Sequence, residues 1–210
     1  MIHQRIVVGP LQCNCAIVAC EKTKHAAIID PGDEGARIVS EVEKAGFEVK
    51  YILHTHAHFD HIAGTGAVRS AIQAPVCLHK GDAEIYRNLP MQGRLFGFEF
   101  GNAPEVEKWI EDNERLRLGE YEIEVLHTPG HSPGSVCLKV FNSAEETLFS
   151  GDTLFQMSIG RSDLWGGSHN QLIQSVKDRI FTLDGDIVVH PGHGPSTRVG
   201  DEKKHNPFFS

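Results

Sequence analysis

The sequence lacks a long apolar run, an excess of basic residues and an apolar leader, and each absence excludes a class of protein. No segment approaches the roughly 18 consecutive apolar residues that a membrane-spanning helix needs. Residues 1–6 do not begin the apolar stretch of a secretory signal peptide. Acidic residues outnumber basic ones by 28 to 20, giving a net charge of −8, and a nucleic-acid backbone needs a basic patch. We therefore expect neither a membrane nor a nucleic acid as partner.

Cysteine is present but not in a pattern that predicts disulfides or a zinc ribbon. The number is odd and no CxxC pair occurs, which favours free thiols in a reducing cytoplasm. Cys13 and Cys15 are interpreted as small buried residues at the start of a strand, with a reactive thiol pair as the alternative. The five residues are Cys13, Cys15, Cys20, Cys77 and Cys137.

The length of 210 residues, with 40% hydrophobic and 23% charged residues, predicts one globular domain over 1–210. Strands and helices alternate irregularly, and several β-rich segments occur in each half. That mixture is typical of an α/β fold in which two mixed sheets pack face to face with helices outside. We predict strands over 5–8, 15–20, 26–29, 49–53, 76–78, 121–126, 135–140, 147–149 and 186–189, and helices over 34–45, 62–72, 171–180 and after 200.

Residues 89–118 do not follow either pattern. Phe96, Phe98 and Phe100 lie among glycines, and an acidic stretch around Trp109 follows. Long segments of this kind are often lids or binding loops. We predict that 89–118 leaves the core as an excursion that covers the substrate, with a packed surface loop or a dimer contact as the alternative.

Thirteen histidines are the outlier of the composition, and the densest cluster is the segment His54-Thr55-His56-Ala57-His58-Phe59-Asp60-His61. It directly follows the apolar strand predicted over 49–53. Because residues two apart point the same way in an extended chain, His56 and His58 can bind one metal ion together. Asp60 and His61 can face a second ion if the chain turns into a helix there.

Three further candidates each follow the end of a predicted strand. His131 lies in a Pro-Gly-His turn, Asp152 in Ser-Gly-Asp, and His193 in a second Pro-Gly-His turn. One such residue alone is usually structural, but the joint pattern favours a metal centre of imidazole and carboxylate ligands. Zinc suits these ligands best, and iron and manganese tolerate them. His54, His127 and His190 are either supports for the ligands or core residues, and we assign His3, His25, His169 and His205 no role in the site.

The segment from Thr55 to His61 resembles the signature of the metallo-β-lactamase superfamily, and the resemblance extends from about Asn14 to the C-terminus. It implies a four-layered αβ/βα sandwich with two metal ions at one edge of the sheets. The ligand sets that it implies are His56, His58 and His131 for the first metal, Asp60, His61 and His193 for the second, and Asp152 as the bridge.

Within that superfamily, Asp60-His61 and the acidic residue at Asp152 resemble glyoxalase II more than zinc β-lactamases, which typically have Cys at the bridge. The segments Gly160–Asp163 and His205–Phe208 resemble a short bacterial glyoxalase II-like subfamily whose members hydrolyse hydroxyacylglutathione thioesters. One feature departs from glyoxalase II: only 210 − 193 = 17 residues follow His193, too few for its C-terminal helical domain that binds glutathione.

The resemblance implies a metal-dependent thioester hydrolase, probed best with S-D-lactoylglutathione. Metal-bound hydroxide would attack the thioester, Asp60 would accept the proton of the water, and Arg161 would pair with a carboxylate of the substrate, unless it forms only a structural pair with Asp163. A persulfide dioxygenase with one iron is an alternative, because the Arg161–Asp163 element resembles that group too. A lactonase is another, whereas a phosphodiesterase should show a basic track that the sequence lacks.

Overall fold

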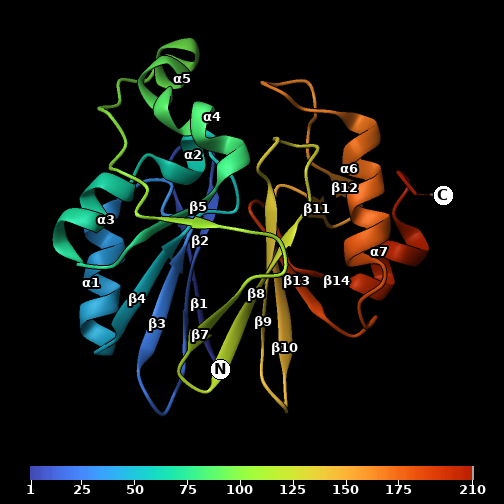
Figure 1. Ribbon diagram of the computed structural model, residues 1–210, viewed down its shortest axis with the longest axis horizontal. Helices are drawn as coiled ribbons and strands as arrows, with labels where there is room; N and C mark the ends of the chain where they lie inside the picture. Colours follow the sequence, from blue (N-terminus) through green and yellow to red (C-terminus); the bar gives the residue numbers. More distant parts are fainter. Residues whose placement is uncertain (210) are drawn as a thin grey trace.

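The computed structural model describes residues 1–209, and two six-stranded sheets form its centre (Figure 1). Neighbouring strands of the first sheet are antiparallel from β1 to β3 and parallel from β3 to β6. The strands of this sheet are, in spatial order, β1 (Ile2–Val8), β2 (Cys13–Ala19), β3 (His25–Ile29), β4 (Glu48–Leu53), β5 (Val76–His79) and β6 (Lys108–Ile110).

The second sheet comes from the C-terminal half of the chain. It is antiparallel apart from the parallel pair of β10 and β13, so both sheets are mixed, as predicted. A two-stranded hairpin, β11 (Leu154–Phe155) and β12 (Ser158–Ile159), stands apart from it. The strands of the second sheet are, in spatial order, β14 (Thr197–Arg198), β13 (Val188–Pro191), β10 (Glu146–Gly151), β9 (Val136–Phe141), β8 (Tyr121–His127) and β7 (Arg115–Leu118).

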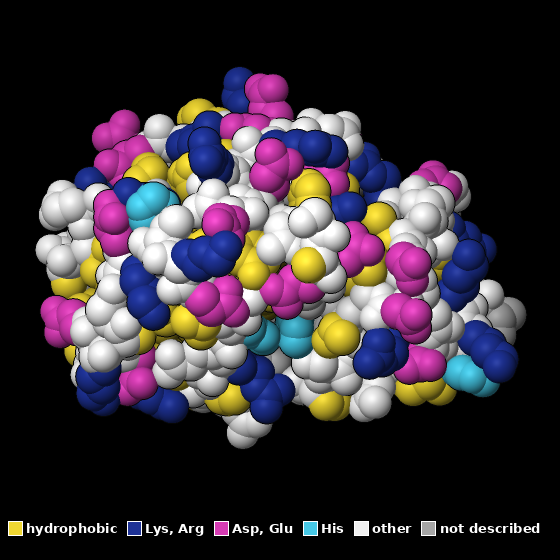
Figure 2. All heavy atoms as spheres, turned by 90° about the horizontal axis from the view of Figure 1, so that it is seen from below, with side chains coloured by type: hydrophobic (Ala, Val, Ile, Leu, Met, Phe, Trp, Pro, Cys, Tyr) yellow, Lys and Arg dark blue, Asp and Glu magenta, His cyan; other side chains and the backbone are white. Residues whose placement is uncertain are grey.

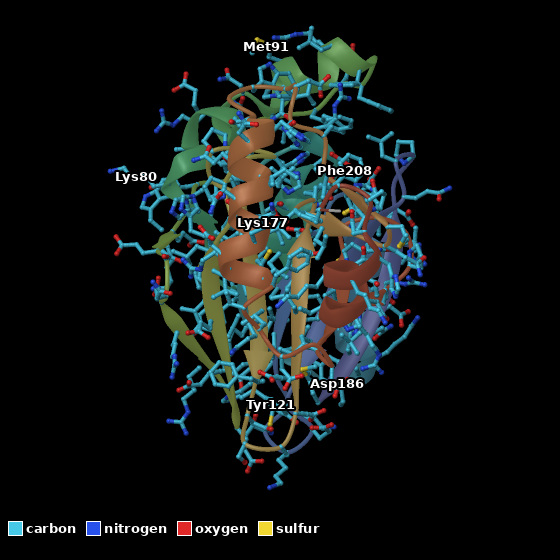
Figure 3. The ribbon with its side chains drawn as sticks, turned by 90° about the vertical axis from the view of Figure 1, so that its right-hand side faces the viewer. Lys80, Met91, Tyr121, Lys177, Asp186 and Phe208 are labelled. Atoms are coloured by element: carbon cyan, nitrogen blue, oxygen red, sulfur yellow. The ribbon has the colours of Figure 1, made fainter. Side chains whose placement is uncertain are left out.

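Helices cover the outer side of each sheet. Figure 1 shows α1 and α3 against the first sheet, and Figure 3 shows α6 and α7 lying across the second. The helices are α1 (Gly35–Ala45), α2 (Phe59–Ile62), α3 (Thr65–Ala71), α4 (Ala83–Arg87), α5 (Leu89–Phe96), α6 (His169–Ser175) and α7 (Val199–His205), with a 3₁₀ turn over Lys80–Asp82 and a π turn over Val176–Ile180.

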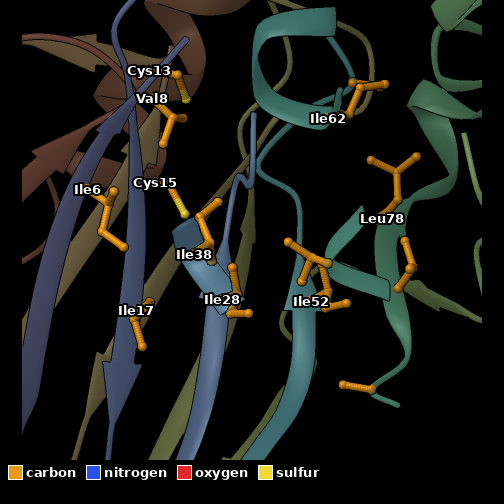
Figure 4. Packing of buried hydrophobic residues seen from close by; sticks show 14 of the residues in the cluster. Ile6, Val8, Cys13, Cys15, Ile17, Ile28, Ile38, Ile52, Ile62 and Leu78 are labelled. Carbon is orange, nitrogen blue, oxygen red and sulfur yellow. The ribbon is translucent and has the colours of Figure 1, made fainter. Parts of the chain in front are cut away.

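Three apolar layers hold these four layers together. Adjacent residues of a strand point to opposite faces, so Ile17 of β2 packs in the layer that contains Ile38 of α1, whereas Val18 packs between the sheets. Leu148 of β10 packs in the third layer, beneath α6 and α7. Figure 4 shows the first layer, with Ile17 and Ile38 among its side chains. Each fully buried isoleucine or leucine stabilises the fold by about 1.5–3 kcal/mol. The predicted sandwich of helices, two sheets and helices is confirmed.

The prediction that 89–118 leaves the core as one excursion is wrong at both ends. Its first part is the helix α5, and its last part contains β6 and β7, which pair with β5 and β8 at the edges of the two sheets. Only residues 97–107 have no regular structure. Strands of three or four residues are too short to show a clear alternation in the sequence, which is why both were missed.

The surface fits the composition. In the view of Figure 2, acidic and basic side chains are interspersed, and that face carries no continuous basic track. Within residues 1–209, no helix combines the length and the hydropathy that a membrane span requires.

Candidate metal centre

The predicted ligands lie together at one edge of the sandwich. They follow the ends of strands from both sheets, and the parallel strands β4, β10 and β13 end at this edge. The short helix α2 begins directly after His58, as the assignment of Asp60 and His61 to a second ion required. The ligands follow β4 (His56, His58, Asp60, His61), β8 (His131), β10 (Asp152) and β13 (His193).

The first set consists of three buried imidazoles. His131 Nε2 lies 2.8 Å from His58 Nδ1 and 3.1 Å from His56 Nε2. The three rings meet nearly at right angles, with interplanar angles from 81° to 89°, so that their nitrogens converge on one point. This geometry matches a three-histidine metal site.

The second set lies beside the first. His193 Nε2 is 3.2 Å from His61 Nε2 and 3.1 Å from Asp60 Oδ2. Asp152 lies between the two sets, because its Oδ1 is 3.4 Å from His61 Nε2 and its Oδ2 is 3.7 Å from both His131 Nε2 and His193 Nε2. The structure thus brings all seven predicted residues together.

The donor chemistry of this cluster fits metal ions. Imidazole nitrogens at about 3 Å from one another need a proton between each pair, whereas a cation satisfies several lone pairs at once. Asp152 Oδ1 is buried and has no hydrogen-bond partner among residues 1–209. Gly192 leaves the space beside it open, because a Cβ there would lie 2.3 Å from Asp152 Oδ1. Divalent metal binding at this His-rich site is what the fold and the donors support.

The electrostatics differ between the sets. Burial lowers the pKa of His56 well below its usual value and that of His58 to about 3, which keeps both imidazoles neutral and ready to bind metal. Burial alone would also lower the pKa of His61, but the negative charges around it, those of Asp152 and Asp60 among them, raise it. Burial alone would raise the pKa of Asp152, but the charge of His61 holds it well below the usual range.

Asp30 supports the second set and was missed in the sequence. Its carboxylate accepts hydrogen bonds from Thr55 N–H (2.7 Å) and Thr55 Oγ1 (2.6 Å), and its Oδ2 lies 3.0 Å from His61 Nδ1. A carboxylate on the far nitrogen of a ligand histidine fixes the ring and its tautomer. The sequence signals only a turn at Asp30-Pro31-Gly32.

Asp82 supports the first set in the same way. This buried carboxylate accepts hydrogen bonds from Ala57 N–H (2.9 Å), Ser132 Oγ (2.7 Å) and Gly134 N–H (2.6 Å). It therefore joins the loop of His56 and His58 to the loop of His131. Burial raises the pKa of Asp82. No local pattern marks this residue, because its partners come from loops distant along the chain.

Arg161 has two roles that must be separated. Its backbone oxygen lies 2.7 Å from His131 Nδ1, which leaves Nε2 of that ring free to bind a metal. Its guanidinium forms two hydrogen bonds with Asp163, at 2.8 and 2.9 Å, and lines the cavity above the ligands. The structural pair with Asp163 is therefore present, and recognition of a substrate carboxylate by Arg161 remains a prediction.

The other singled-out residues have structural surroundings. All five cysteines are free and buried, and Cys13, whose Sγ lies 3.6 Å from His61 Nδ1, has its pKa raised by burial to about 12. A thiol with that pKa is not a nucleophile at neutral pH. The three histidines considered as supports lie near other groups: His54 near Thr65 Oγ1, His127 near Pro133 O and His190 near Ser196 Oγ.

A sequence comparison identifies the family. The family model described as the metallo-beta-lactamase superfamily matches residues 8–193. The chain belongs to this superfamily. The resemblance carried by Thr55–His61 is thereby confirmed, and the match contains all seven residues of the metal cluster.

Two curated relatives in the metallo-β-lactamase superfamily match nearly the full chain. The probable metallo-hydrolase YqgX of Bacillus subtilis (strain 168) is 38% identical over 212 residues, which covers 100% of this chain and 98% of that protein. The hydroxyacylglutathione hydrolase GloC of Haemophilus influenzae is 33% identical over 207 residues, which covers 98% of this chain and 96% of GloC.

Two solved structures have the same metallo-β-lactamase fold. One is described as the B3 metallo-beta-lactamase BLEG-1, with a TM-score of 0.91, 38% identity and 100% coverage of both chains. The other is TTHA1623 in a di-iron-bound form, with a TM-score of 0.88, 37% identity, and coverage of 98% of this chain and 99% of that one.

Proposed function

We propose that this metallo-hydrolase cleaves thioesters and that hydroxyacylglutathione is its substrate. The observation that carries the proposal is the lining of the cavity above the metal cluster. Among its lining residues within 1–209, Arg161 is the single ionisable side chain outside the ligand sets, so no separate general acid is present. A thiolate leaves without being protonated first, whereas an amine does not, and the site therefore suits a thioester.

The chain's own residues prepare the reaction in several ways. Divalent metals held by the two sets would supply Lewis acidity for a carbonyl oxygen and activate water at neutral pH. Asp60 lines the cavity with its side chain 14% exposed, so its carboxylate is placed to accept a proton from water. Phe59 and Trp165 cover the cavity walls and limit the access of bulk water.

Two further observations support a glutathione thioester. GloC is named a hydroxyacylglutathione hydrolase and matches this chain over nearly its whole length. Asp152 lies between the two ligand sets, at the position where zinc β-lactamases typically have Cys. With zinc as the expected metal, the TTHA1623 structure adds iron as a specific candidate.

β-Lactam hydrolysis is a second candidate, because BLEG-1 is described as a B3 metallo-beta-lactamase and shares 38% of its residues with this chain. A β-lactam nitrogen is a poorer leaving group than a thiolate, so the lack of a separate acid favours the thioester. Persulfide oxidation on one iron is the remaining alternative, and it consumes oxygen, which neither hydrolysis does.

One assay separates these reactions. The purified protein, loaded in turn with zinc, iron and manganese, is given S-D-lactoylglutathione, a chromogenic cephalosporin and glutathione persulfide. We expect chelator-sensitive release of thiol from the first and slow or no turnover of the others. Absence of thiol release at millimolar substrate in all three metal forms would overturn the proposal, and oxygen uptake with the persulfide would replace it.

A further inference from the structure

The cavity above the metal cluster has an apolar wall on one side of the ligands. Leu11, Phe59 and Phe96 form this wall, and Phe59 lies between the ligands His58 and Asp60 in the chain. Leu11 and Phe96 are 46% and 44% exposed, an unfavourable placement for large apolar side chains unless a ligand covers them. We call these three residues the apolar wall.

Aromatic packing holds the wall in place. The ring of Phe59 lies 5.1 Å from that of Phe96, 5.6 Å from Phe98 and 5.8 Å from Phe100, measured between centroids. Phe59 N–H donates to Gln92 Oε1 at 3.0 Å. The wall is therefore a built surface and not a set of mobile side chains. Figure 3 shows Met91, on the same helix α5 as Phe96, at the opposite end of the molecule from Tyr121.

The charged side of the cavity is weak. Arg161 is the one cation among the lining residues within 1–209, and Asp163 already neutralises it through two hydrogen bonds. Glutathione carries two carboxylates, and no second lysine or arginine lines this cavity to receive them. The structure thus offers more for the apolar part of a substrate than for a charged thiol.

We propose that the enzyme prefers thioesters whose acyl group is apolar and larger than lactoyl, with the acyl chain on the apolar wall and the thiol on the Arg161 side. This inference rests on the proposed thioester hydrolysis. In the reaction, the C–S bond breaks, the oxygen of water joins the acyl carbon, and a carboxylic acid and a thiol leave. Arg161 lies beside Leu164 and Trp165 in the lining, and the ionic part of a substrate therefore has its partner there.

The cavity also limits the length of the acyl chain. Its volume is about 220 Å³, below the roughly 300–1,000 Å³ of cavities that enclose drug-sized ligands. A chain of about four to six carbons fits this space together with the thioester, whereas a long fatty acyl chain does not.

A series of substrates with one thiol tests the acyl preference. The metal-loaded enzyme is assayed with acetyl-, D-lactoyl-, butyryl- and hexanoylglutathione, and kcat/KM is compared. We expect an increase of up to about fourfold per added methylene from acetyl to butyryl, followed by a plateau. S-butyryl-N-acetylcysteamine, which lacks the charges of glutathione, should react within about threefold of butyrylglutathione, because Asp163 neutralises Arg161.

A matched pair of variants locates the preference. Phe96→Ala should reduce the butyryl-to-acetyl ratio to near one, whereas Leu95→Ala should leave it unchanged, because Leu95 is 64% exposed and does not line the cavity. Thermal melting checks that both variants fold. If D-lactoyl- and acetylglutathione react as fast as butyrylglutathione, the acyl preference is overturned while thioester hydrolysis stands. If no thioester reacts, the proposed function itself has failed.

Discussion

The two ligand sets share one cavity but differ in burial and charge. His56, His58 and His131 are 1%, 5% and 2% exposed, and none of them is a carboxylate. In the second set, the side chains of Asp60 and His193 are 14% and 26% exposed, and Asp60 brings a negative charge. The first set is a closed site of neutral donors, and the second is open to solvent.

This difference assigns different tasks to the two metals. Closed sites with rigid ligands hold a metal tightly, whereas catalytic sites keep a position open for water or substrate. We therefore expect the first set to bind its metal more strongly and the second set to exchange it more readily. Each set also has its own buried carboxylate support, Asp82 for the first and Asp30 for the second.

The largest effect is expected from removing the histidine at the centre of the first set. His131→Ala removes the nitrogen that both His56 and His58 approach, so the first metal should be lost and kcat/KM should fall at least about 10³-fold. Metal content by elemental analysis and thiol release measure the two effects. The exposed His205→Ala is the control and should keep full activity. Retention of both metals in His131→Ala would contradict the assignment.

A smaller loss is expected in the second set. His193→Ala should retain about one metal per chain, because the first set is intact, while kcat/KM falls about 10²-fold. Dialysis against a weak chelator, followed by elemental analysis, shows whether the remaining metal is the tightly held one. Loss of both metals would mean that the two sets do not bind independently, and the comparison would then fail.

The supports allow the comparison to be sharpened without touching a ligand. Asp30→Asn should weaken binding of the second metal about tenfold, and Asp82→Asn should weaken binding of the first by a similar factor. Competition titrations with a chromophoric chelator give both affinities. The same affinity lost in both variants would indicate that these carboxylates stabilise the whole edge and not one set each.

The smallest effect concerns Arg161. Arg161→Gln should leave the metal content unchanged, because the contact with His131 uses the backbone oxygen. The KM for S-D-lactoylglutathione should rise about threefold with little change in kcat, since this exposed guanidinium is already paired with Asp163. An unchanged KM would reduce Arg161 to its backbone role.

Much of the site follows from local sequence. The spacing of His56, His58 and Asp60 is local, and strand ends announce His131 and Asp152 through turn residues, so that each ligand is visible without a structure. The alternation within β2 and β10 likewise predicts two sheets with apolar layers on both faces, because a strand reports its two faces in its own residues.

The tertiary structure alone decided what surrounds those ligands. Asp30 meets His61 across 31 residues, and Asp82 meets Ser132 across 50, so neither support has a signal in its own neighbourhood. The same holds for the apolar wall, where Leu11 from the first hairpin joins Phe96 from α5. Metal-binding residues can be predicted because their chemistry is carried by residue type and spacing. Their supports and the shape of the cavity depend on which distant loops meet, and only packing of the two sheets determines that.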